Sequence, residues 1–91
     1  MSTTTTSPPL GSHSVSVGNF QFSPASLSIS VGETVVWSFG SGTHTTTADG
    51  GQWDSGAKSA GTFSFTFSTA GTYGYVCSFH PTMTGTITVD P

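Results

Sequence analysis

Residues 62–67 read Thr-Phe-Ser-Phe-Thr-Phe, a strict alternation of hydroxyl and aromatic side chains. Successive side chains of a β-strand point to opposite faces, so this stretch predicts a strand with its phenylalanines on one face. Working outward, the same period of two recurs in other short segments bounded by Gly or Pro turns. These segments cover residues 13–17, 20–22, 27–31, 34–39, 72–76 and 85–89. Residues 48–60 show no period and predict a loop.

The number and spacing of these segments predict the fold class. About seven or eight short strands, with a turn roughly every 8–12 residues, are typical of an all-β sandwich or barrel. No segment has the apolar spacing of an amphipathic helix, so we expect little or no helix. The 91 residues suffice for one domain, which we expect over residues 11–91. Residues 1–10 are rich in Ser, Thr and Pro and predict a flexible linker, the remnant of a stalk whose leader or anchor has been removed.

The composition excludes several classes of function. One Lys+Arg against four Asp+Glu argues against nucleic acid as a partner, because phosphate binding needs clustered basic residues. The single cysteine excludes an intrachain disulfide, and no apolar run is long enough to span a membrane. Aromatic residues make up 12% of the chain, which is enough to build a core and argues against disorder.

Candidate metal ligands gather just after the strand predicted at 72–76. Cys77, His80 and Met83 follow a C-x2-H-x2-M spacing, and His44 lies 33 residues before Cys77 in a Gly-flanked turn. A thiolate, two imidazoles and a thioether form a soft donor set that favours copper over magnesium, calcium or manganese. Two histidines and a cysteine with a weak axial methionine is the type 1, or blue, copper arrangement. Zinc is an adventitious substitute, because it accepts similar tetrahedral sites.

Each of these residues also has an ordinary interpretation. A lone cysteine or methionine in a β domain is usually a buried apolar side chain. We interpret His13 as an ordinary strand histidine without a metal role. An enzyme using Cys77 as nucleophile and His80 as base would need an oxyanion hole and an orienting group, and would leave the other two candidates unexplained. We therefore expect no catalytic residues.

The stretch from Val15 to Val89 resembles the cupredoxins, the small blue copper proteins that include plastocyanin, pseudoazurin and amicyanin. The resemblance rests first on a pattern with Phe22, Pro24, Leu27, Ile29, Gly32, Val35 and Trp37, then on His44, and finally on Gly71, Tyr73, Tyr75, Cys77, His80, Met83, Gly85, Ile87 and Val89. The short gap between His80 and Met83 is similar to that of amicyanin. The resemblance implies an eight-stranded Greek-key β-sandwich in which His44, Cys77 and His80 are equatorial copper ligands and Met83 is the axial ligand.

The chain departs from this family at the residue after the first ligand. Many cupredoxins carry an Asn there, whose side chain ties the two ligand loops together, whereas this chain has Thr45. A hydroxyl is shorter and donates one proton only. Fewer hydrogen bonds to the thiolate stabilise Cu(I) relative to Cu(II), so we expect a reduction potential towards the upper part of the family range.

The resemblance also implies a function and partners. We expect a small electron carrier that shuttles one electron between redox partner proteins through a Cu(I)/Cu(II) site. Partners would dock near His80, Phe79 and Pro81, with Gly11 or Leu10 nearby. The scarcity of charge predicts apolar, transient docking with little dependence on salt. We expect a monomer in an extracytoplasmic compartment, the periplasm or the outer cell surface. Alternatives are an electron-relay domain of a larger copper oxidase or reductase, and a copper chaperone or storage protein.

Overall fold

A computed structural model describes residues 11–91, and the linker predicted over residues 1–10 lies outside the described residues. Within this range the chain forms eight strands and no helix, so nothing described there could cross a membrane as a helix. The strands are β2 (Ser12–Gly18), β3 (Gln21–Ser23), β4 (Ser26–Ser30), β5 (Thr34–Phe39), β6 (Thr47–Ala48), β7 (Thr62–Thr66), β8 (Gly71–Cys77) and β9 (His80–Asp90). The predicted all-β fold with little or no helix is confirmed.

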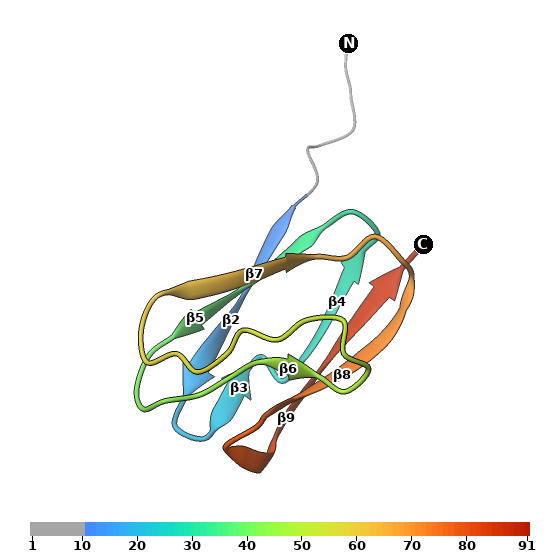
Figure 1. Cartoon of the computed structure of the whole chain (residues 1–91). Coiled ribbons are helices and arrows are strands. Elements are labelled where there is room, and N and C mark those ends of the chain that lie inside the picture. The colour runs from blue at the N-terminus through green and yellow to red at the C-terminus, as the bar shows by residue number, and fades with distance from the viewer. Residues whose placement is uncertain (1–10) are drawn as a thin grey trace.

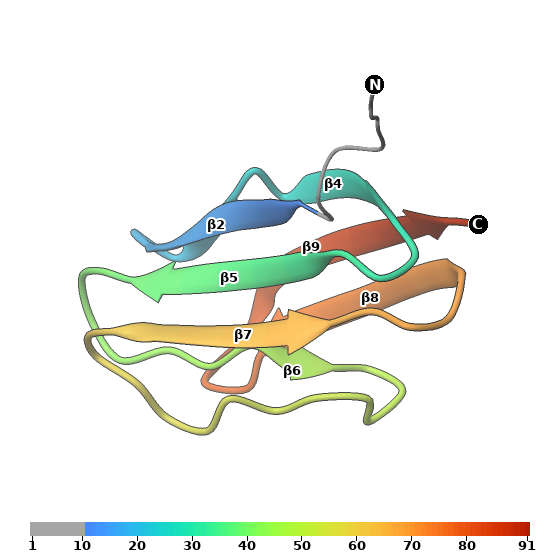
Figure 2. The same cartoon turned by 90° about the horizontal axis from the view of Figure 1, so that it is seen from above.

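The strands form two four-stranded sheets that pack face to face (Figures 1 and 2). One sheet has the order β3-β2-β5-β7 and the other β4-β9-β8-β6. β2 pairs with β5, and β4 with β9, in parallel, whereas the other pairs are antiparallel. The chain changes sheet at every connection from β3 to β8, which gives the crossed connectivity of a Greek-key sandwich.

The alternating side chains of both sheets meet in an aromatic core. Trp37 of β5 is fully buried, and its ring packs edge-on against Tyr75 of β8 with centroids 5.5 Å apart. Burial raises the pKa of Tyr75 because the phenolate would lose its hydration. The remaining buried apolar residues come from both sheets and from two loops. They are Val15, Val17, Phe22, Ile29, Val35, Phe39, Ala48, Trp53, Phe67, Cys77, Met83, Ile87 and Val89.

Three details differ from the predicted elements. The aperiodic segment 48–60 contains Trp53, which is only 5% exposed and packs against Trp37 with centroids 5.4 Å apart. Phe20 does not continue the alternation of β2, because it lies in the turn before β3 with a φ of 57° and its ring is 69% exposed. The last strand begins at His80 and so includes part of the predicted ligand loop.

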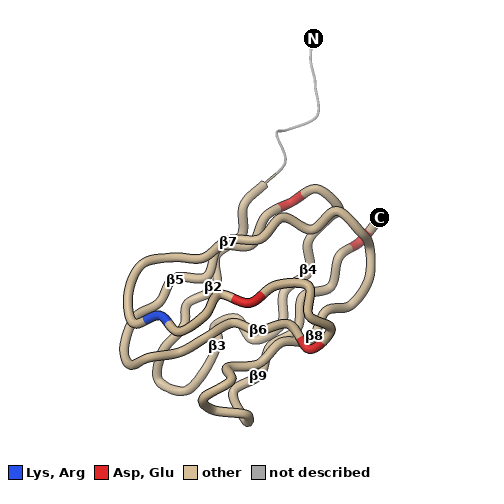
Figure 3. The backbone as a smooth tube through the Cα atoms, in the orientation of Figure 1, with Lys and Arg blue, Asp and Glu red and all other residues tan. Residues whose placement is uncertain are grey.

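The two ends of the sandwich carry different chemistry. The beginning of β2 and the end of β9 lie at one end, and the β8–β9 turn lies at the other (Figure 1). Figure 3 shows that the four acidic residues and the single lysine lie away from the tip of the β8–β9 turn. The tip of the β8–β9 turn, residues 78–83, therefore carries no charged side chain.

Candidate metal centre

The nitrogen and sulfur atoms of His44, Cys77 and His80 converge at the end of the sandwich that carries the β8–β9 turn. One ligand atom from each residue lies within 4.8 Å of the others. His44 comes from the connection between β5 and β6, Cys77 is the last residue of β8, and His80 is the first residue of β9. His44 and Cys77 are buried, whereas His80 is half-buried. The structure thus brings together three of the four candidates from separate parts of the chain.

A tight hairpin places the C-terminal candidates. Cys77 pairs directly with His80, so only Ser78 and Phe79 form the turn between β8 and β9. The next pair along the ladder is Val76 with Thr84, and the shift marks a bulge in β9 that contains Met83. A bulge re-aims the side chains of its strand relative to the ladder. Met83 is 2% exposed and therefore lies inside the sandwich rather than on its surface.

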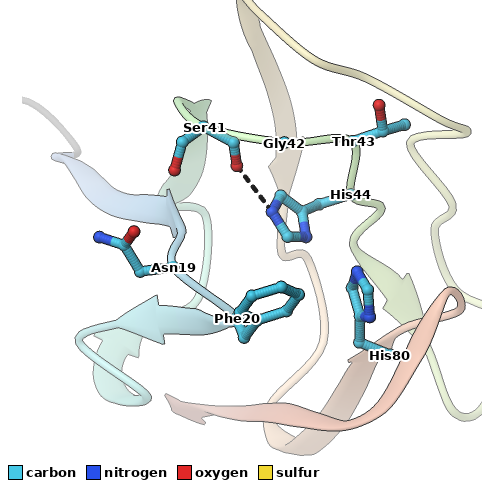
Figure 4. Close-up of a pocket in the computed structure, with 7 residues that line it drawn as sticks. All are labelled: Asn19, Phe20, Ser41, Gly42, Thr43, His44 and His80. Atoms are coloured by element: carbon cyan, nitrogen blue, oxygen red, sulfur yellow. Dashed lines mark hydrogen bonds between the residues drawn. The ribbon is translucent and has the colours of Figure 1, made fainter.

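The imidazole of His44 is held in one orientation from two sides. The backbone N–H of His44 donates to the Lys58 carbonyl oxygen, and the Lys58 N–H donates to the His44 carbonyl oxygen, both at 2.9 Å. Its Nε2 lies 2.8 Å from the carbonyl oxygen of Ser41, which can only accept, so Nε2 carries the proton (Figure 4). The lone pair of Nδ1 is then available, and Nδ1 lies 3.8 Å from the Cys77 Sγ.

The sulfur of Cys77 lies in a dry, sparsely hydrogen-bonded environment. Cys77 is fully buried, and its Sγ accepts a hydrogen bond from the Thr45 backbone N–H at 3.4 Å. Pro81, directly after His80, has no N–H to donate. In the described part of the chain this is the one backbone N–H bonded to the sulfur. The sulfur thus accepts a single, long hydrogen bond from the backbone.

The Thr45 side chain links the two ligand segments. Its Oγ1 accepts a hydrogen bond from the backbone N–H of Ser78 at 2.9 Å, and lies 2.9 Å from the Ser78 hydroxyl. Thr45 is 3% exposed. The hydroxyl is thus long enough to tie the segment after His44 to the turn after Cys77. The departure from Asn at this position changes the donor and acceptor pattern but keeps the link between the loops.

A shallow surface pocket lies beside the two histidines. It measures about 360 Å³ and is lined by Asn19, Phe20, Ser41, Gly42, Thr43, His44 and His80 (Figure 4). The Phe20 ring meets the His80 ring edge-on, with centroids 4.8 Å apart and planes at 87°. Phe79 is also exposed, at 54%. Exposed aromatic rings thus flank the half-buried His80.

Phe20 is the residue that the sequence interpretation missed here. The usable signal was Gly18-Asn19, because glycine and asparagine tolerate the left-handed conformation of a tight turn. Gly11, expected near His80, lies instead at the other end of the sandwich, where its N–H donates to Glu33 Oε2 at 3.1 Å. Leu10 lies outside the described residues. His13 is also far from the cluster, paired with Glu33 Oε1 at 3.1 Å, in line with the prediction that it is an ordinary strand residue.

The converging residues fit a copper ion. Bonds of about 2.0–2.3 Å hold neighbouring donors roughly 3.5–4 Å apart, and the Sγ of Cys77 and Nδ1 of His44 already lie at such a separation. Two imidazoles and a thiolate are the donors that copper prefers over hard cations. The burial of Cys77 keeps water away from the sulfur side of the group.

Comparisons with known proteins agree with this geometry. Residues 11–90 match the family model for copper binding proteins of the plastocyanin/azurin family. A plastocyanin from Scenedesmus fuscus is 38% identical over 87 residues, covering 79% of this chain and 89% of that protein. A purple cupredoxin from Nitrosopumilus maritimus superposes with a TM-score of 0.76 at 30% identity, covering 86% of this chain and 99% of the other. Amicyanin from Paracoccus versutus also superposes with a TM-score of 0.76, at 27% identity over 87% of this chain and 81% of the other. The chain therefore belongs to the plastocyanin/azurin family of copper-binding proteins.

Proposed function

We propose that this protein is a one-electron carrier that binds one copper ion through His44, Cys77 and His80, with Met83 as the weak axial ligand. The observation that carries the proposal is the convergence of two imidazole nitrogens and a buried thiol within 4.8 Å. Copper bound there would supply the Cu(I)/Cu(II) couple. A mixed nitrogen and sulfur set lies between the preferences of the two oxidation states.

The protein's part in this function is to keep the ligands still. His44 is fixed by its backbone pairing with Lys58 and by Ser41, and Cys77 and His80 face each other across a two-residue turn. Ligands held in this way need little rearrangement when one electron is gained or lost. Met83 lies inside the sandwich, where a soft thioether is protected from water.

His80 is the proposed point of approach for partner proteins. It is the one half-buried member of the converging group, and its neighbours Phe79 and Pro81 are exposed. Phe20 extends this apolar surface on the other side of His80. The turns that carry these residues have no charged side chain, so electrostatic steering is weak. We propose that redox proteins dock here through a small apolar contact, of the size typical for transient electron-transfer complexes.

The visible spectrum with Cu(II) tests the proposal. The expected result is an intense thiolate-to-copper charge-transfer band that disappears on reversible one-electron reduction. Cys77→Ser should abolish the band, whereas the matched control His13→Gln should keep it, because His13 lies at the opposite end of the sandwich. A band that survives in Cys77→Ser would overturn the ligand assignment.

The same measurements separate the alternatives. A chaperone or storage protein would stay colourless and bind only Cu(I), but the buried sulfur and the paired backbone of His44 oppose easy release of a metal. A relay domain of a larger oxidase or reductase would show the same band, and the full gene sequence would identify it. Zinc bound during recombinant expression would leave the protein colourless until it is exchanged for copper.

We also propose that residues 11–91 act as one monomeric domain in the periplasm or at the outer cell surface. The family match over residues 11–90, which spans the whole described sandwich, supports this. Sedimentation of the copper-loaded protein and fractionation of the source cells test the two parts separately. Sedimentation as a dimer, or recovery only from the cytoplasm, would contradict them.

A further inference from the structure

A line of hydrogen-bonded side chains connects an exposed carboxylate to the turn that follows Cys77. The Thr47 hydroxyl donates to Asp54 Oδ1 at 3.2 Å. The same Thr47 oxygen lies 2.9 Å from the Thr45 hydroxyl, whose oxygen accepts the Ser78 backbone N–H at 2.9 Å. Three hydrogen bonds thus join Asp54 to the Ser78 amide.

The carboxylate gives this line a direction. A carboxylate only accepts, so Thr47 must use its one proton on Asp54. The Thr47 oxygen is then left as the acceptor for the Thr45 hydroxyl, and the Thr45 oxygen accepts from Ser78. Every proton in the line points towards Asp54. Hydrogen bonds in such a chain polarise one another, so a charge at one end strengthens the bond at the other.

The carboxylate is also held in place by its own segment. The Gly56 N–H donates to Asp54 Oδ1 at 3.0 Å, and Asp54 pairs with Thr47 as an isolated antiparallel bridge. The neighbouring residues Ser55 and Thr46 are also hydrogen-bonded. The Ser55 N–H donates to the Thr46 carbonyl oxygen at 3.0 Å, and the Ser55 hydroxyl oxygen accepts the Thr46 N–H at 2.9 Å. Residues 53–58 therefore form a strap along the segment that follows His44. This arrangement leaves Asp54 facing the hydroxyl line.

We propose that Asp54 is a positioning residue of the copper centre, which acts through Thr47 and Thr45 on the turn after Cys77. This inference rests on the proposed function. The charged end of the line keeps the Thr45 oxygen directed at the Ser78 N–H, which holds the two ligand segments together. The negative charge, relayed along the oriented hydroxyls, favours Cu(II) over Cu(I). Neither effect requires Asp54 to touch the metal.

The chain offers a matched control. Asp49 is another exposed carboxylate, five positions away in sequence, and none of the hydrogen bonds of the hydroxyl line involve it. Asp49→Asn and Asp54→Asn make the same change in net charge and in side-chain shape. A difference between them therefore reports the hydroxyl line rather than the general field of the protein.

The first experiment measures reduction potentials of the copper-loaded protein. Asp54→Asn should raise the potential, because removal of a negative charge disfavours Cu(II). We expect the Cu(I) to Cu(II) ratio at a fixed potential to rise about threefold, which is roughly 28 mV at about 59 mV per tenfold for one electron. Asp49→Asn should change the ratio by clearly less. In a Thr47→Val background, which removes the connecting hydroxyl, Asp54→Asn and Asp49→Asn should become equivalent.

The second experiment follows the Ser78 amide by NMR in the metal-free protein, so it does not depend on copper chemistry. Asp54→Asn should shift this amide proton upfield and speed its exchange, as should Thr47→Val, whereas Asp49→Asn should leave it unchanged. Equal potentials for the two Asn variants, or an unchanged Ser78 amide, would overturn the inference. If the amide responds but copper gives no reversible couple, the line is real and the proposed electron-carrier function is wrong.

Discussion

Gly85 of β9 is the position where one added methyl group should do the most damage. It pairs with Tyr75 of β8, and a Cβ built on Gly85 would come within 3.0 Å of three Tyr75 ring and hydroxyl atoms. Tyr75 is 1% exposed and packed against Trp37, so the ring has no free space to move into. Overpacking of this kind costs about 1–3 kcal/mol. Replacing glycine by alanine also stabilises the protein by roughly 0.4–1 kcal/mol, because it reduces the conformational entropy of the unfolded chain.

We therefore expect Gly85→Ala to lower the free energy of unfolding by about 1–2 kcal/mol. For a domain of this size, that corresponds to a fall in Tm of roughly 5–15 °C. The control is Gly74→Ala in the same hairpin, where the added Cβ would meet only the Asp49 carboxylate, with Oδ2 at 2.6 Å. That group ends an exposed side chain that can turn away, so the cost should be near zero.

Urea and thermal unfolding followed by near-ultraviolet circular dichroism would compare the two variants. The copper charge-transfer band provides a second readout, because Tyr75 lies two residues before Cys77 in β8. Equal stabilities of Gly85→Ala and Gly74→Ala would refute the argument that the Tyr75 ring occupies the space above Gly85.

Four further predictions concern the loops and the surface. Trp53→Phe removes the hydrogen bond from the indole N–H to Thr46 Oγ1, which measures 3.0 Å, and leaves a fully buried hydroxyl without this donor. We expect a loss of about 1–3 kcal/mol in urea unfolding, and a loss under about 0.5 kcal/mol would contradict the role of that bond. The pKa of Glu33 is lowered, first by the Ser30 N–H that it accepts, so its stabilising effect is present above the ordinary value of 4.5 and is lost as the pH falls through the lowered pKa. As the pH is lowered from 6, the free energy of unfolding should therefore fall less in Glu33→Gln than in the wild type. The same fall in both proteins would contradict this role of Glu33. Thr45→Asn should lower the reduction potential by adding a hydrogen-bond donor near the thiolate. An unchanged potential in voltammetry would show that Thr45 does not cause the high potential expected from the sequence. Finally, electron-transfer rates should change little between low and high salt in stopped-flow experiments, whereas a steep fall would reveal a charged docking surface.

The strands and the approach of Cys77 to His80 could be predicted because both are encoded over short distances. Alternation along residues 62–67 needs only neighbouring residues to be recognised, and the structure has β7 there. The spacing of Cys77 and His80 likewise sets up a hairpin in which the two residues face each other. Placing His44 beside them rested on its residue type and its Gly-flanked turn, and the family resemblance then supported it, because no local pattern joins residues so far apart.

The parts that could not be predicted depend on contacts between distant loops. Trp53 lies in an aperiodic segment, and nothing nearby in the sequence shows that its ring fills the core between the sheets. Phe20 follows β2 in the expected alternation and leaves it only because the chain turns at Asn19, where φ is 50°. Asp54 belongs to a strap whose partner, the segment after His44, is recognised only once the backbone bridge at Thr47 is known.

The parallel pairing of β4 with β9 has a consequence for how the protein acquires its metal. Residues 26–30 pair with residues 86–90, so this sheet cannot close until β9 has been synthesised. Cys77 and His80 face each other only in a hairpin whose second strand is that same β9. Partly synthesised chains therefore expose a thiol without its assembled surroundings. His44, Cys77 and His80 can therefore converge only once β9 is in place, and folding, which is slowed by such distant contacts, sets the earliest moment at which they do.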